Sequence, residues 1–332
     1  MNVIFTILIL LAISYVMFTI AKRLKIPVVV TLIISGLLLG MPQLRNAIIE
    51  PNSGIIAGLG DIALIALLFM AGMESSIKIL HQERKEAFII AISAAIIPFL
   101  LGFLFFFSFG FPIVFSAVVG ICLSITAEGT KARVLLEMNK LKTKLGSVIM
   151  ETGIIDDLFG LTMFIIITYI FRENFIREDL LLVGALLAFF FGLLVQKYIG
   201  KKSEVIKHIE NFAWVIVIPF FFISMGLLFD LKQLMMNPYL LIFFLLMAMA
   251  GKLIGTLITK PFVSLSWNQL YVVGWAMNSR GAIELALAQI ALKTAIIGVD
   301  TYSALVGMAL ISTLIFPFIL SRMIKKHPRI MG

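Results

Sequence analysis

Long apolar segments separated by short loops run through the whole chain. Eleven segments have roughly the length that spans a bilayer as a helix, about 20 residues, or the shorter length of a partly re-entrant helix. They cover residues 2–21, 27–40, 55–76, 87–109, 113–138, 145–171, 179–199, 210–230, 237–259, 266–293 and 300–323. Hydrophobic residues make up 61% of the sequence, whereas soluble domains usually contain about 45–50%. We therefore predict an all-α polytopic membrane protein with about eleven transmembrane helices.

The basic residues are distributed unevenly over the two predicted sides of the membrane. Eighteen of the 27 lysines and arginines lie in loops after odd-numbered segments or in the C-terminal tail, and five lie on the opposite side. Cytoplasmic loops are enriched in lysine and arginine, so we expect the N-terminus outside and the C-terminus inside the cell. The net charge of +9 therefore indicates membrane topology and contact with lipid, and not a nucleic-acid partner.

The residues that usually hold cofactors are scarce in this chain. The single cysteine, Cys122, excludes an intrachain disulfide, and the three histidines lie in loops or in the tail. The loops are short, and only nine residues follow the last predicted helix. We therefore expect one membrane domain over residues 1–332, without a nucleotide-binding domain, a cofactor or an enzymatic activity.

A weak internal repeat relates the two halves of the sequence. A shift of 154 residues places LLFMAGMESSIKIL (67–80) on FFISMGLLFDLKQL (221–234), with Gly72 on Gly226. The same shift carries the four segments from 55–76 to 145–171 onto the four segments from 210–230 to 300–323. Because the displacement is five helices, an odd number, the two copies have opposite orientations. This pattern is typical of the inverted-topology repeats of secondary transporters.

Two adjacent aspartates, Asp156 and Asp157, lie in the middle of the apolar segment 145–171. Asp156 is 11 residues from Leu145, which is about 16 Å of helix and half of a roughly 30 Å hydrocarbon core. A carboxylate at this depth costs about 2.5–3.5 kcal/mol on insertion scales. Such residues normally carry ions or protons, so we predict that both aspartates are functional.

Two apolar segments are interrupted by polar residues at corresponding positions of the repeat. One interruption is SITAEGTKAR (124–133), and the other is MNSRGAIE (277–284). The 154-residue shift places Thr126 on Arg280 and Ala127 on Gly281. Broken helices at corresponding positions of two halves mark the binding site of a transporter, because their unwound backbone lines a cavity. We expect two discontinuous helices that cross near Asp156 and Asp157.

One lysine falls inside a predicted membrane helix at a depth close to that of the aspartates. Lys252 lies eight residues from the cytoplasmic end of segment 237–259, which is about 12 Å of helix. A buried lysine needs a charged partner or loses its proton. We predict that Lys252 pairs with Asp156; the alternative is that its side chain extends to the cytoplasmic surface beside Lys260.

Further charged residues surround the predicted crossing. Arg280 keeps its charge, and we expect Glu284, four residues later, to pair with it and hold the crossing together; Glu128 is a second candidate partner. Asp61, in segment 55–76, is either functional or a polar contact between helices. Glu151 either lines an entry route to the aspartates or faces the lipid headgroups. The sequence leaves these last two choices open.

The buried carboxylates imply a transport mechanism. A desolvated carboxylate holds either a proton or a small cation, because metal-type ligation needs the deprotonated form. If the site opens to one side of the membrane at a time, this competition gives cation/proton exchange. A channel or sensor that kept the fold and lost the coupling is an alternative from another class, and a sodium:organic-anion symporter is a further one. Na⁺, K⁺ and Li⁺ use similar oxygen ligands, so the sequence does not distinguish them.

Four motifs of this chain resemble the cation:proton antiporter 2 family, which includes bacterial and archaeal sodium/proton antiporters and Kef-type exchangers. The motifs are TGIIDDLFGL, SITAEGTKARVLLEMNKL, GKLIGT and AMNSRGAIELALAQIAL. The resemblance covers nearly the whole chain. It implies a homodimer in a prokaryotic plasma (inner) membrane. In this dimer a core of six helices, including the two crossed broken helices, would move like an elevator beside a dimerising scaffold.

The resemblance also implies roles for individual residues. Asp157 matches the ion-binding aspartate of the family, and Asp156 matches a position whose aspartate pairs with a lysine, here Lys252, in electrogenic members. Thr126 and Ala127 match the first unwound stretch, and Arg280 and Glu284 match the second. The resemblance thus implies an electrogenic Na⁺/H⁺ antiporter in which Asp157, Asp156 and Thr126 bind Na⁺, or K⁺ or Li⁺ in an alternative exchanger.

The chain departs from the family pattern in two respects. About thirteen helices are usual in the family, and the two expected between segments 179–199 and 210–230 are missing. Glu128 also adds a carboxylate at a position where small or hydroxyl residues are more common. With this reduced set, we expect residues 1–54 and 172–209 to form mainly the scaffold. Residues 55–171 and 210–323 would form the ion-translocating core and its inverted repeat.

Overall fold

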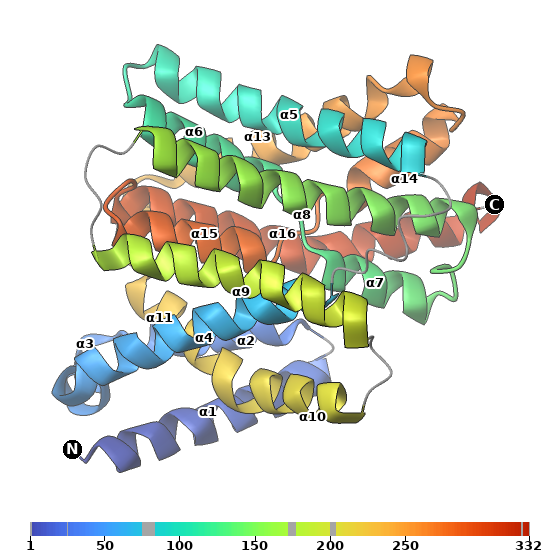
Figure 1. Cartoon of the computed structure of the whole chain (residues 1–332). Helices are drawn as coiled ribbons and strands as arrows, with labels where there is room; N and C mark the ends of the chain where they lie inside the picture. The colour runs from blue at the N-terminus through green and yellow to red at the C-terminus, as the bar shows by residue number, and fades with distance from the viewer. Residues whose placement is uncertain are drawn as a thin grey trace. The chain divides into compact units, whose positions relative to one another are not determined.

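The computed structural model describes residues 2–24, 26–74, 84–171, 177–199, 204–326 and 328–331. Within these residues the regular structure is entirely helical (Figure 1). Each of the eleven apolar segments predicted from the sequence is helical in its described part, and the two interrupted segments are each split into two helices. Lys78, which the sequence repeat aligns with Lys232, lies outside the described residues.

Several helices begin at a proline, as local chemistry predicts, because proline tolerates the first helical turn and supplies a suitable φ. Pro27 precedes α2 (Val28–Leu39), Pro112 precedes α6 (Ile113–Ser124), and Pro238 begins α13 (Pro238–Leu257). The start of α14 (Trp267–Ala276) has a capping box between Ser266 and Gln269. The helix boundaries therefore follow largely from local sequence.

Six helical stretches of the described chain are long and apolar enough to cross a membrane by length and composition. They are Val3–Leu24, Pro42–Met73, Lys85–Ser108, Ile206–Leu228, Pro238–Phe262 and Val299–Lys326. The helix with the two aspartates, α8 (Lys144–Phe171), has 28 residues but contains three carboxylates. The protein is thus a membrane protein with several apolar helices, and the total of eleven spans stays a prediction.

The chain divides into two compact units, Met1–Ser75 with Arg177–Met235, and Ser76–Ile176 with Met236–Gly332. The first unit contains α1 (Val3–Leu24), α2, α3 (Pro42–Leu44), α4 (Ser53–Glu74), α9 (Arg177–Ile199), α10 (Glu204–Phe212) and α11 (Ile218–Leu228). Within it, α4 packs against α9 and α11, and α2 packs against α1 and α11. The short α12 (Leu231–Met236) lies at the end of this unit.

Close backbone contacts at glycines hold the first unit together. A Cβ on Gly72 of α4 would collide with the carbonyl oxygen of Phe189 in α9, and a Cβ on Gly192 would collide with that of Phe69. Small residues let membrane helices approach closely. The same arrangement joins α2 to α11, where a Cβ on Gly36 would lie 2.9 Å from the Cα of Gly226. Gly72 and Gly226, which the sequence repeat aligns, therefore both serve close helix packing.

These contacts predict the effect of a methyl group at the α4–α9 interface. We expect Gly72→Ala to destabilise the protein by about 1–3 kcal/mol, because the added Cβ forces two closely packed backbones apart. Gly58 is the matched control, since it lies in the same helix and a Cβ there would meet nothing within 4 Å. Denaturant unfolding in detergent measures both variants. Equal stability of Gly72→Ala and Gly58→Ala would contradict the packing argument.

The second unit contains α5 (Arg84–Ser108), α6, α7 (Glu128–Glu137), α8, α13, α14, α15 (Ala282–Lys293) and α16 (Val299–Lys326). Within it, α5 packs against α6, α8 and α13, and α13 also packs against α14 and α16. Figure 1 shows α5 and α8 running side by side. Buried aliphatic side chains from α5, α7, α8, α14 and α16 form a common core.

The packed units group the segments in another way than the sequence repeat does, and the assignment of ranges to scaffold and core stays a prediction. The sequence groups 55–171 with 210–323, whereas the structure packs α4, α10 and α11 with the N-terminal helices. Helices α4 and α11 are apolar around most of their surface, so hydrophobic periodicity does not identify their neighbours. The glycine contacts of α4 and α2 decide the grouping instead.

Candidate functional site

The two interrupted helices of the second unit meet at their breaks. The first break separates α6 from α7 at residues 125–127, and the second separates α14 from α15 at residues 277–281. The backbone N–H of Ala127 donates to the carbonyl of Ser279 at 2.9 Å, and the Ser279 hydroxyl donates to the carbonyl of Ala127 at 2.7 Å. These two bonds satisfy part of the unwound backbone inside the protein, as membrane depth requires.

A glycine at the second break permits this crossing. Gly281 is extended, and a Cβ at this position would collide with the methyl group of Ala127. The sequence repeat places Ala127 on Gly281, and the structure brings these two residues into contact. The interrupted segments predicted from the sequence therefore lie together, as expected for a crossed pair.

Arg280 ties the second break to the C-terminal end of α6. Its guanidinium donates to the carbonyl of Leu123 at 2.8 Å, to that of Cys122 at 3.3 Å and to that of Ile125. The last carbonyls of a helix lack intrahelical partners and carry partial negative charge. Arg280 therefore satisfies these groups and neutralises the helix end, a role that the sequence did not reveal.

Two further contacts fix the position of Arg280. Its guanidinium lies 3.5 Å from the Glu284 carboxylate, and its backbone carbonyl accepts a bond from Thr313 of α16 at 3.0 Å. Both charged side chains are 1% exposed. The ion pair expected between Arg280 and Glu284 is present, and its predicted role in holding the crossing together stays a prediction.

Asp156 lies in a buried network that joins α8, α13 and the first break. The Lys252 ammonium is 2.8 Å from Asp156 Oδ1, and both side chains are fully buried. The Thr126 hydroxyl donates to Asp156 Oδ2 at 3.1 Å. Lys252 therefore pairs with Asp156, and does not extend to the surface, because the carboxylate and the lysine compensate each other's charge in the interior.

Asp157 is buried in a different way. It is 3% exposed, and its Oδ1 has no hydrogen-bond partner among the described residues. Gly153 and Gly160 lie on the same face of α8, one turn on either side of it. Glu128 and Lys131 of α7 are close enough to interact electrostatically with the Asp157 carboxylate. Buried polar atoms are normally hydrogen-bonded, so Asp157 Oδ1 is one of the exceptions among the described residues.

Lys131 is a component of the site that sequence reasoning missed. It is fully buried, and its ammonium donates to the Thr126 hydroxyl at 3.2 Å and lies 3.9 Å from the Met277 sulfur. The pattern that pointed toward it is Glu128–Lys131, an oppositely charged pair spaced i, i+3 directly after a helix break. Its position against the crossing follows only from the tertiary structure.

The two secondary candidates lie in different units. Glu151 of α8 is fully buried within the second unit, so its carboxylate does not face the lipid headgroups. It precedes Asp157 by six residues, and its predicted place on an entry route stays a prediction. Asp61 lies half-buried on α4, in the first unit, and its predicted functional role likewise stays a prediction.

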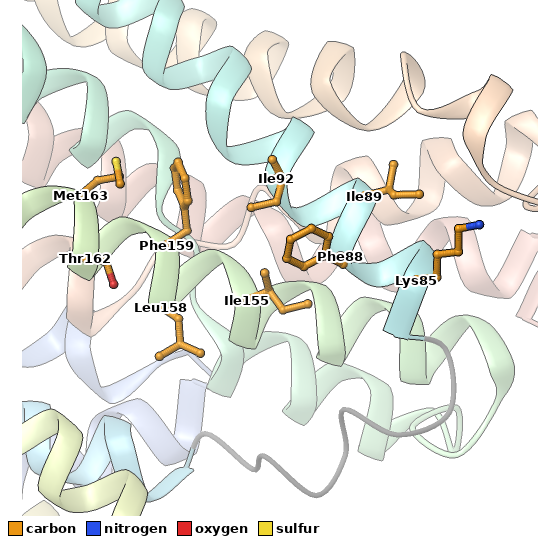
Figure 2. Close-up of a pocket in the computed structure, with 9 residues that line it drawn as sticks. All are labelled: Lys85, Phe88, Ile89, Ile92, Ile155, Leu158, Phe159, Thr162 and Met163. Carbon is orange, nitrogen blue, oxygen red and sulfur yellow. The ribbon is translucent and has the colours of Figure 1, made fainter.

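An apolar groove of about 880 Å³ lies elsewhere in the second unit, between α5 and α8 (Figure 2). Its lining residues are Lys85, Phe88, Ile89, Ile92, Ile155, Leu158, Phe159, Thr162 and Met163. The α8 residues of this set are centred on the face of the helix opposite Gly153 and Asp157. The groove is therefore not the site formed by the buried acids.

Two interrupted helices that meet beside buried acids in a polytopic membrane protein are the site architecture of secondary transporters. The chain belongs to the sodium/hydrogen exchanger family, a family of transporters, because the transmembrane model of that family matches residues 7–184 and 175–326. The family resemblance inferred from the sequence motifs is thereby confirmed.

Individual relatives agree with this assignment. The chain is 27% identical to a Na(+)/H(+) antiporter of Enterococcus hirae over 364 residues, covering 92% of this chain and 94% of the relative. It is 26% identical to the Na(+)/H(+) antiporter NhaS4 of Synechocystis, covering 88% and 90%. Its fold is similar to that of the sodium proton antiporter MjNhaP1 from Methanocaldococcus jannaschii, with a TM-score of 0.68 at 16% identity over 97% and 98% of the two chains.

The alignment with the Enterococcus hirae antiporter concerns the prediction that this chain has two helices fewer than is usual in the family. The alignment extends over 364 residues, which exceeds the 332 residues of this chain. Some residues of the Enterococcus hirae antiporter therefore have no counterpart here. This is compatible with the loss of a helix pair, which stays a prediction.

Proposed function

We propose that this protein exchanges Na⁺ for H⁺ across the membrane, with the cation and the proton competing for Asp157. The observation that carries the proposal is the buried Asp157 oxygen without a hydrogen-bond partner among the described residues, next to the crossing of two broken helices. A buried carboxylate oxygen without a hydrogen-bond donor is costly. A bound proton or a bound cation removes this cost.

The neighbouring groups suit a small monovalent cation. Asp157, Asp156 and Thr126 supply carboxylate and hydroxyl oxygens, and hard cations prefer oxygen ligands. Because a carboxylate ligates a cation only when it is deprotonated, cation binding expels the proton. The antiporter activities of the Enterococcus hirae and Synechocystis relatives support Na⁺ as the cation.

We propose further that the exchange is electrogenic. The Lys252 ammonium and Asp156 form a buried ion pair at 2.8 Å. A cation that takes Asp156 as a ligand weakens this pair, and a buried lysine without its carboxylate favours the neutral form. Lys252 then releases a second proton for each cation, so one cycle moves net charge across the membrane.

The alternating access of this site is proposed on the family resemblance. In this proposal, the protein is a homodimer in a prokaryotic inner membrane, and the unit that carries the broken helices moves like an elevator. The second unit holds the crossing, Asp156, Asp157 and Lys252 together, which supports its movement as one body with the bound ion. The inverted repeat of segments 55–171 and 210–323 belongs to the same proposal.

Proton-coupled flux in proteoliposomes tests the function. With a pH gradient across the membrane, we expect addition of Na⁺ to dissipate the gradient, with Li⁺ and K⁺ tested separately. A response to K⁺ but not to Na⁺ would assign a K⁺/H⁺ exchanger. Downhill Na⁺ flux without proton movement would assign a channel. Exchange whose rate does not respond to an imposed membrane potential would exclude the role proposed for Lys252.

A further inference from the structure

The Lys131 ammonium lies at the edge of the proposed cation site. It donates to Thr126 Oγ1 at 3.2 Å, and the same hydroxyl donates to Asp156 Oδ2 at 3.1 Å. Lys131 is fully buried although it lies in the first turn of α7, directly after the break. A charged side chain in this environment is expensive, so Lys131 is a candidate functional residue.

A glycine of α8 makes room for this side chain. A Cβ on Gly153 would collide with the Lys131 ammonium and would lie 3.2 Å from Glu128 Cγ. Gly153 precedes Asp157 by one helical turn on the same face. The ammonium is therefore seated against the face of α8 that carries Asp157, and it interacts electrostatically with that carboxylate.

The chemistry of the ammonium resembles that of the transported ion. A lysine side chain ends in a compact monovalent cation that donates to oxygen and accepts nothing. Thr126 is one of the oxygen ligands proposed for Na⁺, so a cation bound there meets the Lys131 ammonium at the same oxygen. The two positive charges cannot occupy that position together.

Glu128 offers Lys131 an alternative partner. It lies three residues earlier on α7, a spacing at which side chains are neighbours on the helix surface. It is half-buried and packs against the same glycine of α8. Because the lysine stem is flexible, a rotation of the side chain would carry the ammonium from Thr126 toward the Glu128 carboxylate.

We propose that Lys131 is a tethered competitor of the transported cation. When no cation is bound, the Lys131 ammonium occupies the Thr126 side of the site. When the cation binds, the ammonium moves to Glu128. The proposal rests on the proposed exchange function, because the competition concerns the affinity of that exchange for its cation. Lys131 thereby sets the affinity for the cation, and Glu128 acts on the cation through Lys131.

Substitutions of Lys131 and Glu128 should change the KM for Na⁺ in opposite directions. We expect Lys131→Met to lower the KM for Na⁺ by about tenfold, if the ammonium holds the site about 90% of the time in the absence of Na⁺. We expect Glu128→Gln to raise the KM, because Lys131 loses the partner to which it withdraws. The double variant should behave like Lys131→Met. Arg133→Met is the matched control, since Arg133 is exposed on the same helix and its loss should leave the KM unchanged.

Transport and thermal unfolding measurements distinguish a failure of the proposed exchange function from a failure of the Lys131 proposal. If the wild type exchanges no cation for protons, the proposed function is wrong. If the wild type exchanges but Lys131→Met has an unchanged or raised KM, the tethered competitor is wrong. Stabilisation of the purified protein by Na⁺ in a thermal unfolding assay gives the affinity without transport, and Lys131→Met should reach half-saturation at lower Na⁺. If Lys131→Met does not fold, an unchanged or lowered KM in Glu128→Gln overturns the proposal.

Discussion

Asp157→Asn should reduce cation/proton exchange to the level of protein-free liposomes. An asparagine keeps the size of the side chain but neither takes up a proton nor offers a negative charge to a cation. The substitution should leave the fold intact, since Asp157 Oδ1 has no hydrogen-bond partner among the described residues. Dissipation of an imposed pH gradient by Na⁺ measures the activity.

The control for this experiment is Glu137→Gln, which changes an exposed acid of the same unit whose partner is Arg133. We expect this variant to exchange at the wild-type rate, because surface ion pairs contribute little. Thermal unfolding of both purified variants establishes that they are folded. Exchange at a wild-type rate in Asp157→Asn would refute competition at this residue.

Lys252→Ala should lower the free energy of unfolding by about 3–5 kcal/mol, because it leaves the buried Asp156 carboxylate without its counter-charge. The ion pair has 2.8 Å between Nζ and Oδ1 with both side chains fully buried. Denaturant titration of the purified protein in detergent measures this loss. Lys232→Ala is the matched control, since Lys232 is exposed and surface substitutions usually stay within about 0.5 kcal/mol.

The single variant Asp156→Asn and the double variant Asp156→Asn with Lys252→Ala complete a double-mutant cycle. Removing both charges of a buried pair is often nearly neutral, whereas removing one is strongly destabilising. We therefore expect the double variant to be more stable than either single variant, although its exchange should no longer respond to the membrane potential. If the loss of stability in the double variant equals the sum of the losses in the two single variants, the pair is not coupled.

Much of the site followed from local sequence. Asp156 and Asp157 stand out because carboxylates are expensive at membrane depth. The breaks at Thr126–Ala127 and at Arg280–Gly281 stand out because polar residues interrupt apolar segments at corresponding positions of the repeat. Depth placed Lys252 near both aspartates, and the family resemblance also implied its pairing with Asp156.

The partners of the long side chains did not follow from the sequence. Arg280 was expected to pair with Glu284, and the structure adds bonds to the carbonyls of Leu123, Cys122 and Ile125. Every residue has a carbonyl, so sequence spacing does not select the ones that a distant arginine reaches. The sequence did not reveal the role of Lys131 either. Lys131 lies in α7, whereas its contacts Thr126 and Gly153 lie in the first break and in α8, and only the tertiary structure brings these elements together.

The sequence by itself determined that this protein is helical, that it lies in the membrane, where its helices break, and which residues carry charge at depth. These properties depend on residue types and their order along one segment. The tertiary structure alone decided that α4 packs with α9 at Gly72 and Gly192, and that Lys131 joins the acidic site. An apolar helix surface presents the same chemistry on every side, so only close backbone contacts and buried polar bonds determine which helices become neighbours.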